Sequence, residues 1–197
     1  MPYKFGNYIC TAMKSKTLKY VTVGLAALGV TIFITLWRAG AFADVKVVQG
    51  NQGGYLLIGT DHKGSYQKIG SVFSKVKDAQ RAHKMDSAMF VGVYYDDPGK
   101  IEEAKLRSFA GIVVKDSSDG LKLIKSNPDF HFVSIPNRKS YYTELETSGM
   151  LSMIVAAVKA YPKLGETISA DRVSPNAQGM AFEEYHNGFT RFVMHVE

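Results

Sequence analysis

The sequence predicts an α+β fold in which two pseudo-symmetric βαββ repeats form an antiparallel sheet with helices on one face, preceded by one N-terminal transmembrane helix. The main observation is a duplicated segment, first over Tyr55–Pro98 and again over Ser140–Gly188. Each copy passes from a strand-like run through a glycine and an amphipathic helix to an aromatic strand that ends in turn residues. One βαββ unit buries its sheet face only against its sister. We therefore expect one domain, with its functional site where the halves meet.

The second observation is an uncharged run near the N-terminus, Val21–Trp37. With the residues around it, this run approaches the roughly 20 residues that cross a bilayer. Tyr20 and Trp37 lie at its two ends, where amphipathic aromatic side chains prefer the membrane interface. The predicted organisation is a basic tail over 1–19, a membrane anchor over 20–42, a linker over 43–53 and a globular domain over 54–197.

The apolar run is either a cleaved signal peptide or a membrane anchor that stays on the protein. Ala41-Phe42-Ala43 resembles a signal-peptide cleavage site after a basic region and an apolar region, so a protein secreted after cleavage near Ala43 is the alternative. The basic region and the apolar run are both long for a signal peptide, which favours an uncleaved, single-pass anchor. Three lysines within residues 14–19 face Arg38 alone on the other side. The positive-inside rule then places the domain on the extracytoplasmic side.

Composition argues against several classes of partner. Five of the 24 basic residues and one of the 18 acidic residues lie in residues 1–44, which leaves 19 against 17 in the rest. A nearly neutral domain without a clustered basic face is not expected to bind nucleic acid. Cys10 is the one cysteine and lies in the tail, so the domain has no disulfide or cysteine metal site. No metal-binding His pair or phosphate loop is found, and we expect no metal and no cofactor.

The first repeat is predicted element by element. Apolar residues recur at i, i+3, i+4 and i+7 between Ser65 and Arg81, which indicates a helix. Asp96–Gly99 has the Asp, Pro and Gly chemistry of a turn that closes the preceding strand. The elements expected here are strands over 45–48 and 55–61 separated by a turn over 50–54, a helix over 65–81, and strands over 89–95 and 106–114.

The second repeat follows the same order. Pro128 and Pro162 are expected to end its two helices, and Asn187-Gly188 is a strong hairpin signal. The longer helix is apolar almost all round. The elements expected are a loop over 116–120, a helix over 121–126, strands over 130–135 and 139–147, a helix over 150–160, and strands over 182–185 and 189–196. Residues predicted to pack on the sheet are Leu151, Ile154, Val155 and Val158, with Met150 and Met153 at the seam between repeats.

Four motifs occur in the order and spacing of a known family: His62–Tyr66, Val91–Pro98, Lys105–Arg107 and Phe182–Tyr185. On these motifs the chain resembles the GyrI-like, SOUL-related small-molecule-binding domains, the effector-binding domains of bacterial regulators. It is most similar to a membrane-anchored branch that includes the endoplasmic-reticulum autophagy receptor. The resemblance implies a small-molecule ligand in a groove between the repeats. It implies no autophagy role, because the receptor's autophagy motif lies in a tail beyond the domain.

Glu183 is the carboxylate that the family's Glu-x-Tyr pattern places in the groove, and Tyr185 shares its face of the strand because side chains alternate. In the corresponding strand, Val93 and Tyr95 share a face. If the helices cover one side of the sheet, the remaining concave side is the expected pocket. A carboxylate beside aromatic walls suits a cationic ligand, or acts as a base if burial raises its pKa. The plainer readings are a solvated Glu and core tyrosines.

His62 and Tyr66 are further ligand-binding candidates, because they flank Gly64 at a strand-to-helix turn where free N–H groups can hold an anion. The plainer reading is a turn that glycine permits. Arg107 is a candidate partner for the acidic turn at Asp96. Haem, which SOUL relatives carry, is disfavoured because no strand histidine is singled out as a ligand.

These observations favour a membrane-anchored domain that binds a small apolar or cationic molecule or a partner, and an enzyme is the less favoured reading. Related hydrolases of cyclopropane-containing compounds use a Glu and a Trp in the groove. The one tryptophan here is Trp37, in the apolar run. A hydrolase that uses Glu183 as its base is one alternative. A membrane-tethered protein-interaction module, marked by an exposed apolar patch, is the other.

Overall fold

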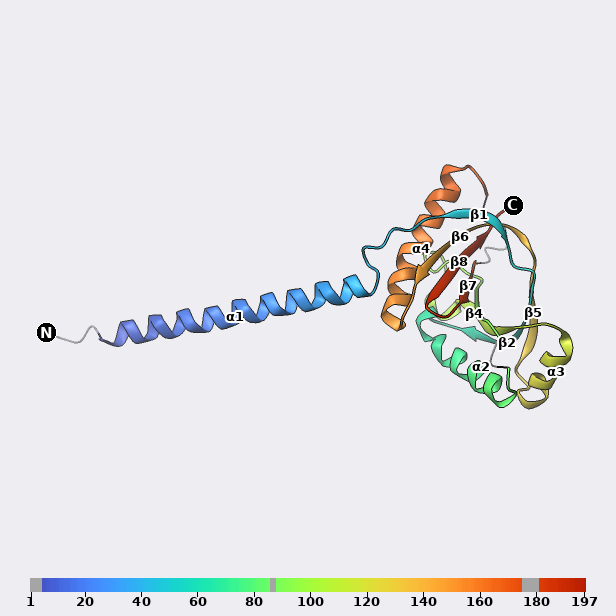
Figure 1. The fold of residues 1–197 in the computed structure, drawn as a ribbon, viewed down its shortest axis with the longest axis horizontal. Helices are drawn as coiled ribbons and strands as arrows, with labels where there is room; N and C mark the ends of the chain where they lie inside the picture. The colour runs from blue at the N-terminus through green and yellow to red at the C-terminus, as the bar shows by residue number, and fades with distance from the viewer. Residues whose placement is uncertain (1–4, 86–87, 175–180) are drawn as a thin grey trace.

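The protein consists of a long N-terminal helix joined to an α+β domain (Figure 1). The structure is a computed structural model that describes residues 5–85, 88–174 and 181–197. The strands are β1 (Val48–Gln52), β2 (Tyr55–Lys63), β3 (Phe90–Tyr94), β4 (Arg107–Val114), β5 (His131–Ile135), β6 (Arg138–Glu146), β7 (Ala181–Tyr185) and β8 (Phe189–His195). The α-helices are α1 (Phe5–Arg38), α2 (Gly70–Ala82), α3 (Ser117–Ser126) and α4 (Met150–Ala170). Single 3₁₀ turns cover Tyr66–Lys68 and Glu103–Lys105.

The predicted duplication is confirmed by the strand order, which is β1-β6-β8-β7-β3-β4-β2-β5 with every pair antiparallel. One repeat is β2-α2-β3-β4 and the other is β6-α4-β7-β8. Their strands lie in the matching orders β3-β4-β2 and β7-β8-β6, and the central pairing of β3 with β7 joins the halves. The outermost strands are exchanged, because β1 pairs with β6 and β5 pairs with β2.

The sheet is curled because two short links join strands from its opposite sides. Gly53-Gly54 connects β1 to β2, and Pro136-Asn137 connects β5 to β6. The links touch, since the Gly54 amide donates to the Ile135 carbonyl at 2.8 Å. Gly53 has a φ of +99°, and a Cβ there would lie 2.3 Å from the Pro136 carbonyl oxygen. Only glycine suits both the conformation and the crossing.

The curl closes the concave face around a hydrophobic core. Its fully or almost fully buried members are Leu57, Val91, Val93, Phe109, Ile135, Phe182 and Val193. The described side chains of this face thus pack as core, where the sequence predicts the wall of a pocket. The helices lie on the outer, convex face. Helix α2 packs on β2 and β4, and α4 packs on β6 and β8. The central strands β3 and β7 lie beneath the seam between the two helices.

Helix α4 continues past the residue predicted to end it. Pro162 lies inside the helix and points to solvent. Proline removes one backbone hydrogen bond, but the buried row continues beyond it at a spacing of four residues, which holds the helix together. That row is Ser152, Ala156, Ala160, Leu164 and Ile168. The predicted packing of Leu151, Ile154 and Val158 on the sheet is wrong, because these side chains are exposed.

Two further boundaries differ from the prediction. The first strand covers Val48–Gln52 instead of 45–48, because the supposed turn residues pair with β6, Gly50 opposite Ser140. Helix α3 begins at Ser117, four residues earlier than expected, because the Asp116 carboxylate accepts from the Ser118 amide at 2.8 Å. A side-chain cap of this kind starts a helix within what looks like a polar loop.

Replacing the cap should destabilise the domain modestly. We expect Asp116→Ala to lower the urea concentration at which the domain unfolds, because the first amides of α3 lose their acceptor. Asp116→Asn keeps an acceptor oxygen and should recover most of the loss. Urea unfolding of the full chain in mild detergent, followed by circular dichroism, measures both. Equal losses in the two variants would contradict the capping role.

Helix α1 contains a stretch, Thr17–Arg38, that is long and apolar enough to cross a membrane. The stretch has 22 residues, a mean hydropathy of 1.9 and no burial within the protein. Such a helix near an N-terminus fits an anchor or a signal sequence. Residues 1–4 of the predicted tail lie outside the described residues, and from Phe5 the tail belongs to the same helix.

A glycine ends α1, and a lysine from α4 binds the turn that follows. Gly40 has a φ of +81°, and the Ala41 amide donates to the Leu36 carbonyl at 3.0 Å, as in a Schellman cap. The Lys159 ammonium donates to the carbonyls of Gly40 and Ala41 at 2.9 Å each, and to that of Ala43. A cation at a helix C-terminus is favoured by the helix dipole. This contact ties the end of α1 to the middle of α4.

Candidate functional site

A buried carboxylate lies beneath the seam between α2 and α4. Glu183, on β7, is 8% exposed. It accepts hydrogen bonds from three tyrosine hydroxyls: Tyr161 at 2.7 Å on one oxygen, and Tyr185 at 2.5 Å and Tyr94 at 3.1 Å on the other. We call these four residues the Glu183 cluster. Both repeats contribute to it, because Tyr94 comes from β3 and the others from β7 and α4.

Strand register explains why the cluster forms here. Gly92 of β3 is paired directly with Glu183 of β7, and paired residues of an antiparallel sheet point to the same face. A Cβ at Gly92 would lie 3.2 Å from the Tyr94 hydroxyl and 3.3 Å from the Tyr185 hydroxyl. The glycine therefore leaves the space that the two hydroxyls occupy beside the carboxylate.

Each tyrosine of the cluster packs against a further aromatic ring. Tyr94 meets Tyr66 edge to face, with ring centroids 4.9 Å apart. Tyr185 meets Phe73 of α2 at 5.0 Å, and Tyr161 meets Phe192 of β8 at 5.7 Å. Such rings present π-faces that attract cations as well as apolar surface.

The electrostatic balance of the cluster is unusual for a buried carboxylate. Burial raises the pKa of Glu183, and the hydrogen bonds from the three tyrosines oppose that rise. Burial and the neighbouring carboxylate raise the pKa of Tyr94, Tyr161 and Tyr185 well above the ordinary value, so these hydroxyls remain protonated donors. Among the described residues no Lys, Arg or His forms an ion pair with Glu183. When Glu183 is ionised, the cluster therefore holds a negative charge that no described residue pairs with.

The adjacent carboxylate shows the contrast. Glu184 is 0% exposed and faces the concave side of the sheet, where Arg191 donates to it at 2.9 Å. Tyr55 donates to its other oxygen at 3.1 Å, and burial beside this carboxylate raises the pKa of Tyr55 to about 12. His186 lies 3.3 Å from the Glu184 carboxylate. A buried charge that is paired in this way has a structural role.

The structure brings some of the predicted site residues together and separates others. Glu183 and Tyr185 belong to the cluster, and Tyr66 contacts it through Tyr94. Val93 and Tyr95 do not lie with Glu183: Val93 pairs with Phe182, and both pack in the concave core. The grouping was wrong because alternation within one strand does not determine which face it shares with its neighbour.

His62 and the acidic turn have local contacts. A ring nitrogen of His62 lies 3.0 Å from the Ser65 carbonyl oxygen, at the turn after β2. The Tyr66 hydroxyl donates to the Asp96 carbonyl at 2.8 Å. Arg107 forms the predicted pair with Asp96, through Nη2 at 2.7 Å and Nε at 3.0 Å. The contacts of Tyr66 and Arg107 with Asp96 fix the turn after β3, next to the Tyr66 ring that packs on Tyr94.

Sequence reasoning missed Tyr94, Tyr161 and Gly92 as parts of the site. The predicted helix over 150–160 stops one residue before Tyr161, whereas α4 continues to Ala170. Tyr94 alternates with Val93 and Tyr95, so it lies on the opposite face from the two residues predicted to bind the ligand. A detectable signal was the position of Gly92 in the middle of an aromatic strand, because an isolated glycine in a strand often marks a close approach.

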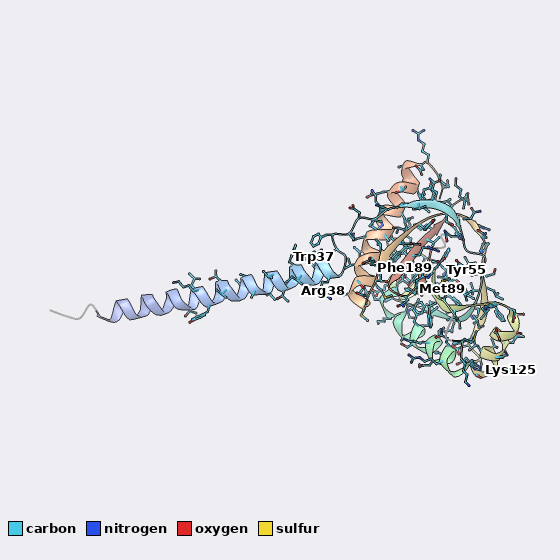
Figure 2. The ribbon with its side chains drawn as sticks, in the orientation of Figure 1. Trp37, Arg38, Tyr55, Met89, Lys125 and Phe189 are labelled. Atoms are coloured by element: carbon cyan, nitrogen blue, oxygen red, sulfur yellow. The ribbon has the colours of Figure 1, made fainter. Side chains whose placement is uncertain are left out.

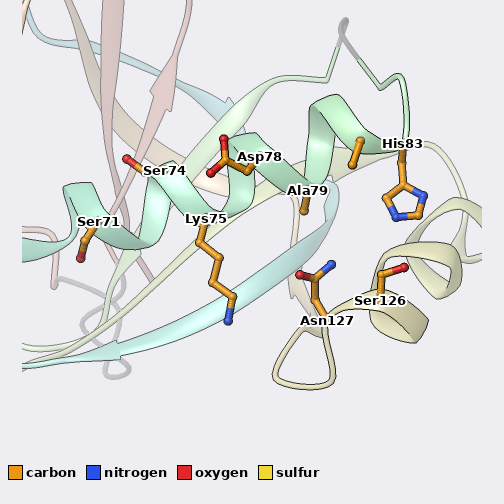
Figure 3. A pocket seen from close by; sticks show the side chains of 9 residues that line it. Ser71, Ser74, Lys75, Asp78, Ala79, His83, Ser126 and Asn127 are labelled. Carbon is orange, nitrogen blue, oxygen red and sulfur yellow. The ribbon is translucent and has the colours of Figure 1, made fainter.

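A separate surface depression lies between α2 and α3, with a volume of about 560 Å³ (Figure 3). Its lining includes Lys75, Asp78, His83 and Asn127, and none of the Glu183 cluster. Lys75 is already paired with Asp129 at 2.6 Å. Among the described residues no group of three or more His, Cys, Asp or Glu side chains is placed to hold a metal ion. The Glu183 cluster is therefore the candidate site.

Comparison with known proteins identifies the domain. The family model of the GyrI-like small molecule binding domain matches residues 52–190. No curated protein sequence matches the chain.

Solved structures share the fold. An integron cassette protein from Vibrio cholerae is 11% identical, with a TM-score of 0.55, covering 77% of this chain and 95% of that one. The EcmrR C-terminal domain is 12% identical, with a TM-score of 0.53, covering 78% and 98%. SAV2435, solved bound to tetraphenylphosphonium, is 14% identical, with a TM-score of 0.51, covering 77% and 94%. At these identities the likeness establishes the fold.

Proposed function

The chain belongs to the GyrI-like small-molecule-binding domain family, and from this premise we propose that it binds a lipophilic cation at the Glu183 cluster while α1 anchors it in a membrane. The observation that carries the proposal is a buried carboxylate with three neutral donors and no countercharge among the described residues. Leaving a buried charge unpaired is unfavourable. A ligand that supplies the positive charge removes that penalty.

The surroundings of the carboxylate define the chemical class of the ligand. Phe73, Tyr66 and Phe192 add aromatic surface around the hydroxyls. A delocalised cation with apolar substituents gains both cation–π attraction and apolar burial at such a site. A strongly hydrated ammonium would lose its hydration shell and would gain few hydrogen-bond acceptors in return. SAV2435, which shares the fold, was solved with a ligand of this class, tetraphenylphosphonium.

The ligand enters, in this proposal, through the seam between α2 and α4. The two helices pack on different halves of the sheet. Tyr161 is contributed by α4 and Phe73 by α2, so a small separation of the helices uncovers Glu183 from both sides. The tyrosine hydroxyls satisfy the carboxylate until the cation arrives.

Titration with tetraphenylphosphonium tests this function. We expect Glu183→Gln to weaken binding by about 100-fold, because the variant keeps the shape of the side chain but removes the charge. The control is Glu146→Gln, which neutralises an exposed carboxylate on β6. Isothermal titration of the full chain in non-ionic detergent measures both dissociation constants, with neutral triphenylphosphine oxide as the second ligand. Equal affinity of wild type and Glu183→Gln for the cation would refute the proposal.

A hydrolase is the second candidate, because burial raises the pKa of Glu183 toward the range that suits a general acid or base. Turnover of a reactive cyclopropane-bearing compound that disappears in Glu183→Gln would support this function. Turnover that survives the substitution would remove Glu183 from the chemistry.

A further inference from the structure

The outer face of α4 is apolar and exposed along its first three turns. Its exposed large side chains are Met150, Leu151, Met153, Ile154 and Val158, and we call them the outer stripe. Met150 is 79% exposed, Ile154 52% and Val158 68%. The stripe lies on the side of α4 away from the buried row that packs on β6 and β8. A contiguous apolar face of this size marks an interaction surface.

The outer stripe lies beside the end of the membrane helix. Lys159, one residue after Val158, binds the backbone carbonyls of Gly40, Ala41 and Ala43. Figure 1 shows α4 lying across the end of α1, with α1 leading away from the domain. Trp37 and Arg38 are labelled at this junction in Figure 2. The side chains of Trp37 and Phe42 are exposed there as well.

We infer that the outer stripe and Phe42 dock into the headgroup region of the membrane that α1 spans. This inference rests on the proposed anchoring by α1. A helix that crosses the end of a membrane-spanning helix lies along the bilayer surface, and an amphipathic helix in that position buries its apolar face among the headgroups and upper acyl chains. Trp37 marks the same level, because tryptophan prefers the interface.

The position of the outer stripe next to the end of α1 favours lipid over a protein as its binding partner. The turn after α1 is held directly against α4, because Ala39 is buried and Lys159 binds the backbone carbonyls of the turn over 40–43. The domain therefore cannot move its outer stripe far from the bilayer that holds α1. A second copy or a partner on the same face would have to fit between α4 and that surface.

Docking of the outer stripe would also place the ligand site at the membrane surface. Tyr161 lies three residues after Val158 on α4 and donates to Glu183 at 2.7 Å. Lipophilic cations partition into bilayers, and a docked α4 presents the seam to molecules that leave the bilayer. The source of the ligand is then the membrane itself.

Spin labelling of the full chain tests the docking. In a Cys10→Ser background, single labels are placed at Ile154→Cys on the outer stripe, Ile32→Cys on α1 and Leu121→Cys on α3. Leu121 is the matched control, because it is an exposed aliphatic residue, 52% exposed, on a helix far from α1 (Figure 1). The protein is reconstituted into liposomes of phosphatidylcholine and phosphatidylglycerol at three to one. Collision rates with oxygen, which concentrates in lipid, and with a water-soluble nickel chelate are measured by electron paramagnetic resonance.

We expect the labels at Ile32 and Ile154 to collide more with oxygen, and the label at Leu121 to collide more with the nickel chelate. A label at Ile154 that behaves like the one at Leu121, while Ile32 reports lipid, overturns the docking and leaves the anchor in place. A label at Ile154 that is shielded from both reagents and broadened by a second label overturns it in favour of a second copy. A label at Ile32 that reports water overturns the anchor and the docking together.

Discussion

Adding one methyl group at Gly59 should destabilise the domain by more than about 3 kcal/mol, a large share of the total stability of a domain. Gly59 of β2 is paired directly with Gly111 of β4. A Cβ at Gly59 would lie 2.0 Å from the Ala110 carbonyl oxygen and 2.5 Å from the Gly111 Cα. Both atoms are backbone, so no side-chain rotation relieves the overlap and the two strands must separate. Strand β2 also pairs with β5, so the separation would disturb three strands of the sheet.

Gly70→Ala is the matched control for this substitution. Gly70 is the first residue of α2, and a Cβ there meets no atom within 4 Å. Alanine favours a helix more than glycine does, so this variant should be neutral or slightly stabilising. Urea unfolding of the full chain in mild detergent compares the two free energies. A Gly59→Ala variant that unfolds at the wild-type urea concentration would show that β2 and β4 are not held as close as described.

The duplicated architecture could be predicted because both copies show the same order of strand-like, helical and turn patterns along the chain. The α2 pattern and the Asn187-Gly188 turn are local signals, and the structure places a helix and a hairpin there. The full length of α4 could not be predicted, because Pro162 is a local stop signal while the buried residues Leu164 and Ile168 act through packing. Tertiary contacts outweighed a local preference at this point.

The candidate site also has residues that the sequence predicts and residues that only the tertiary structure brings together. Glu183 and Tyr185 share a face by alternation within one strand, and this could be predicted from their spacing. Tyr94 and Tyr161 reach the same carboxylate from another strand and from a helix. Their meeting depends on the register between β3 and β7 and on the continuation of α4. A single sequence specifies neither of these by pattern alone, so the pattern predicts Val93 and Tyr95 as site residues and leaves out Tyr94.

Stability and ligand binding should respond to pH in opposite directions through Glu183. Burial raises the pKa of Glu183 in the folded state, so between its ordinary pKa of about 4.3 and the raised value the folded chain holds a proton that the unfolded chain has released. The contribution of Glu183 to the free energy of unfolding is therefore fully present below the ordinary pKa and falls as pH rises through the raised one. The difference in the free energy of unfolding between wild type and Glu183→Gln, measured as a function of pH, gives the contribution of Glu183 alone. Asp96 and Asp129 are paired and have lowered pKa values, so their contributions to stability increase as pH rises and cancel in this difference.

A bound cation reverses the preference, because it pairs with the ionised carboxylate. Below the raised pKa, we expect the Kd of tetraphenylphosphonium to fall by about tenfold for each unit of pH increase, and to level off above it. Binding in the lower range must release one proton, since Glu183 ionises as the cation enters and the hydroxyls of Tyr94, Tyr161 and Tyr185 keep theirs. Titration calorimetry in two buffers of different ionisation enthalpy counts that proton. Glu183→Gln should bind weakly with a flat pH profile and no proton release, and a wild-type profile as flat as the variant's would mean that the cation is recognised by the aromatic walls without the carboxylate.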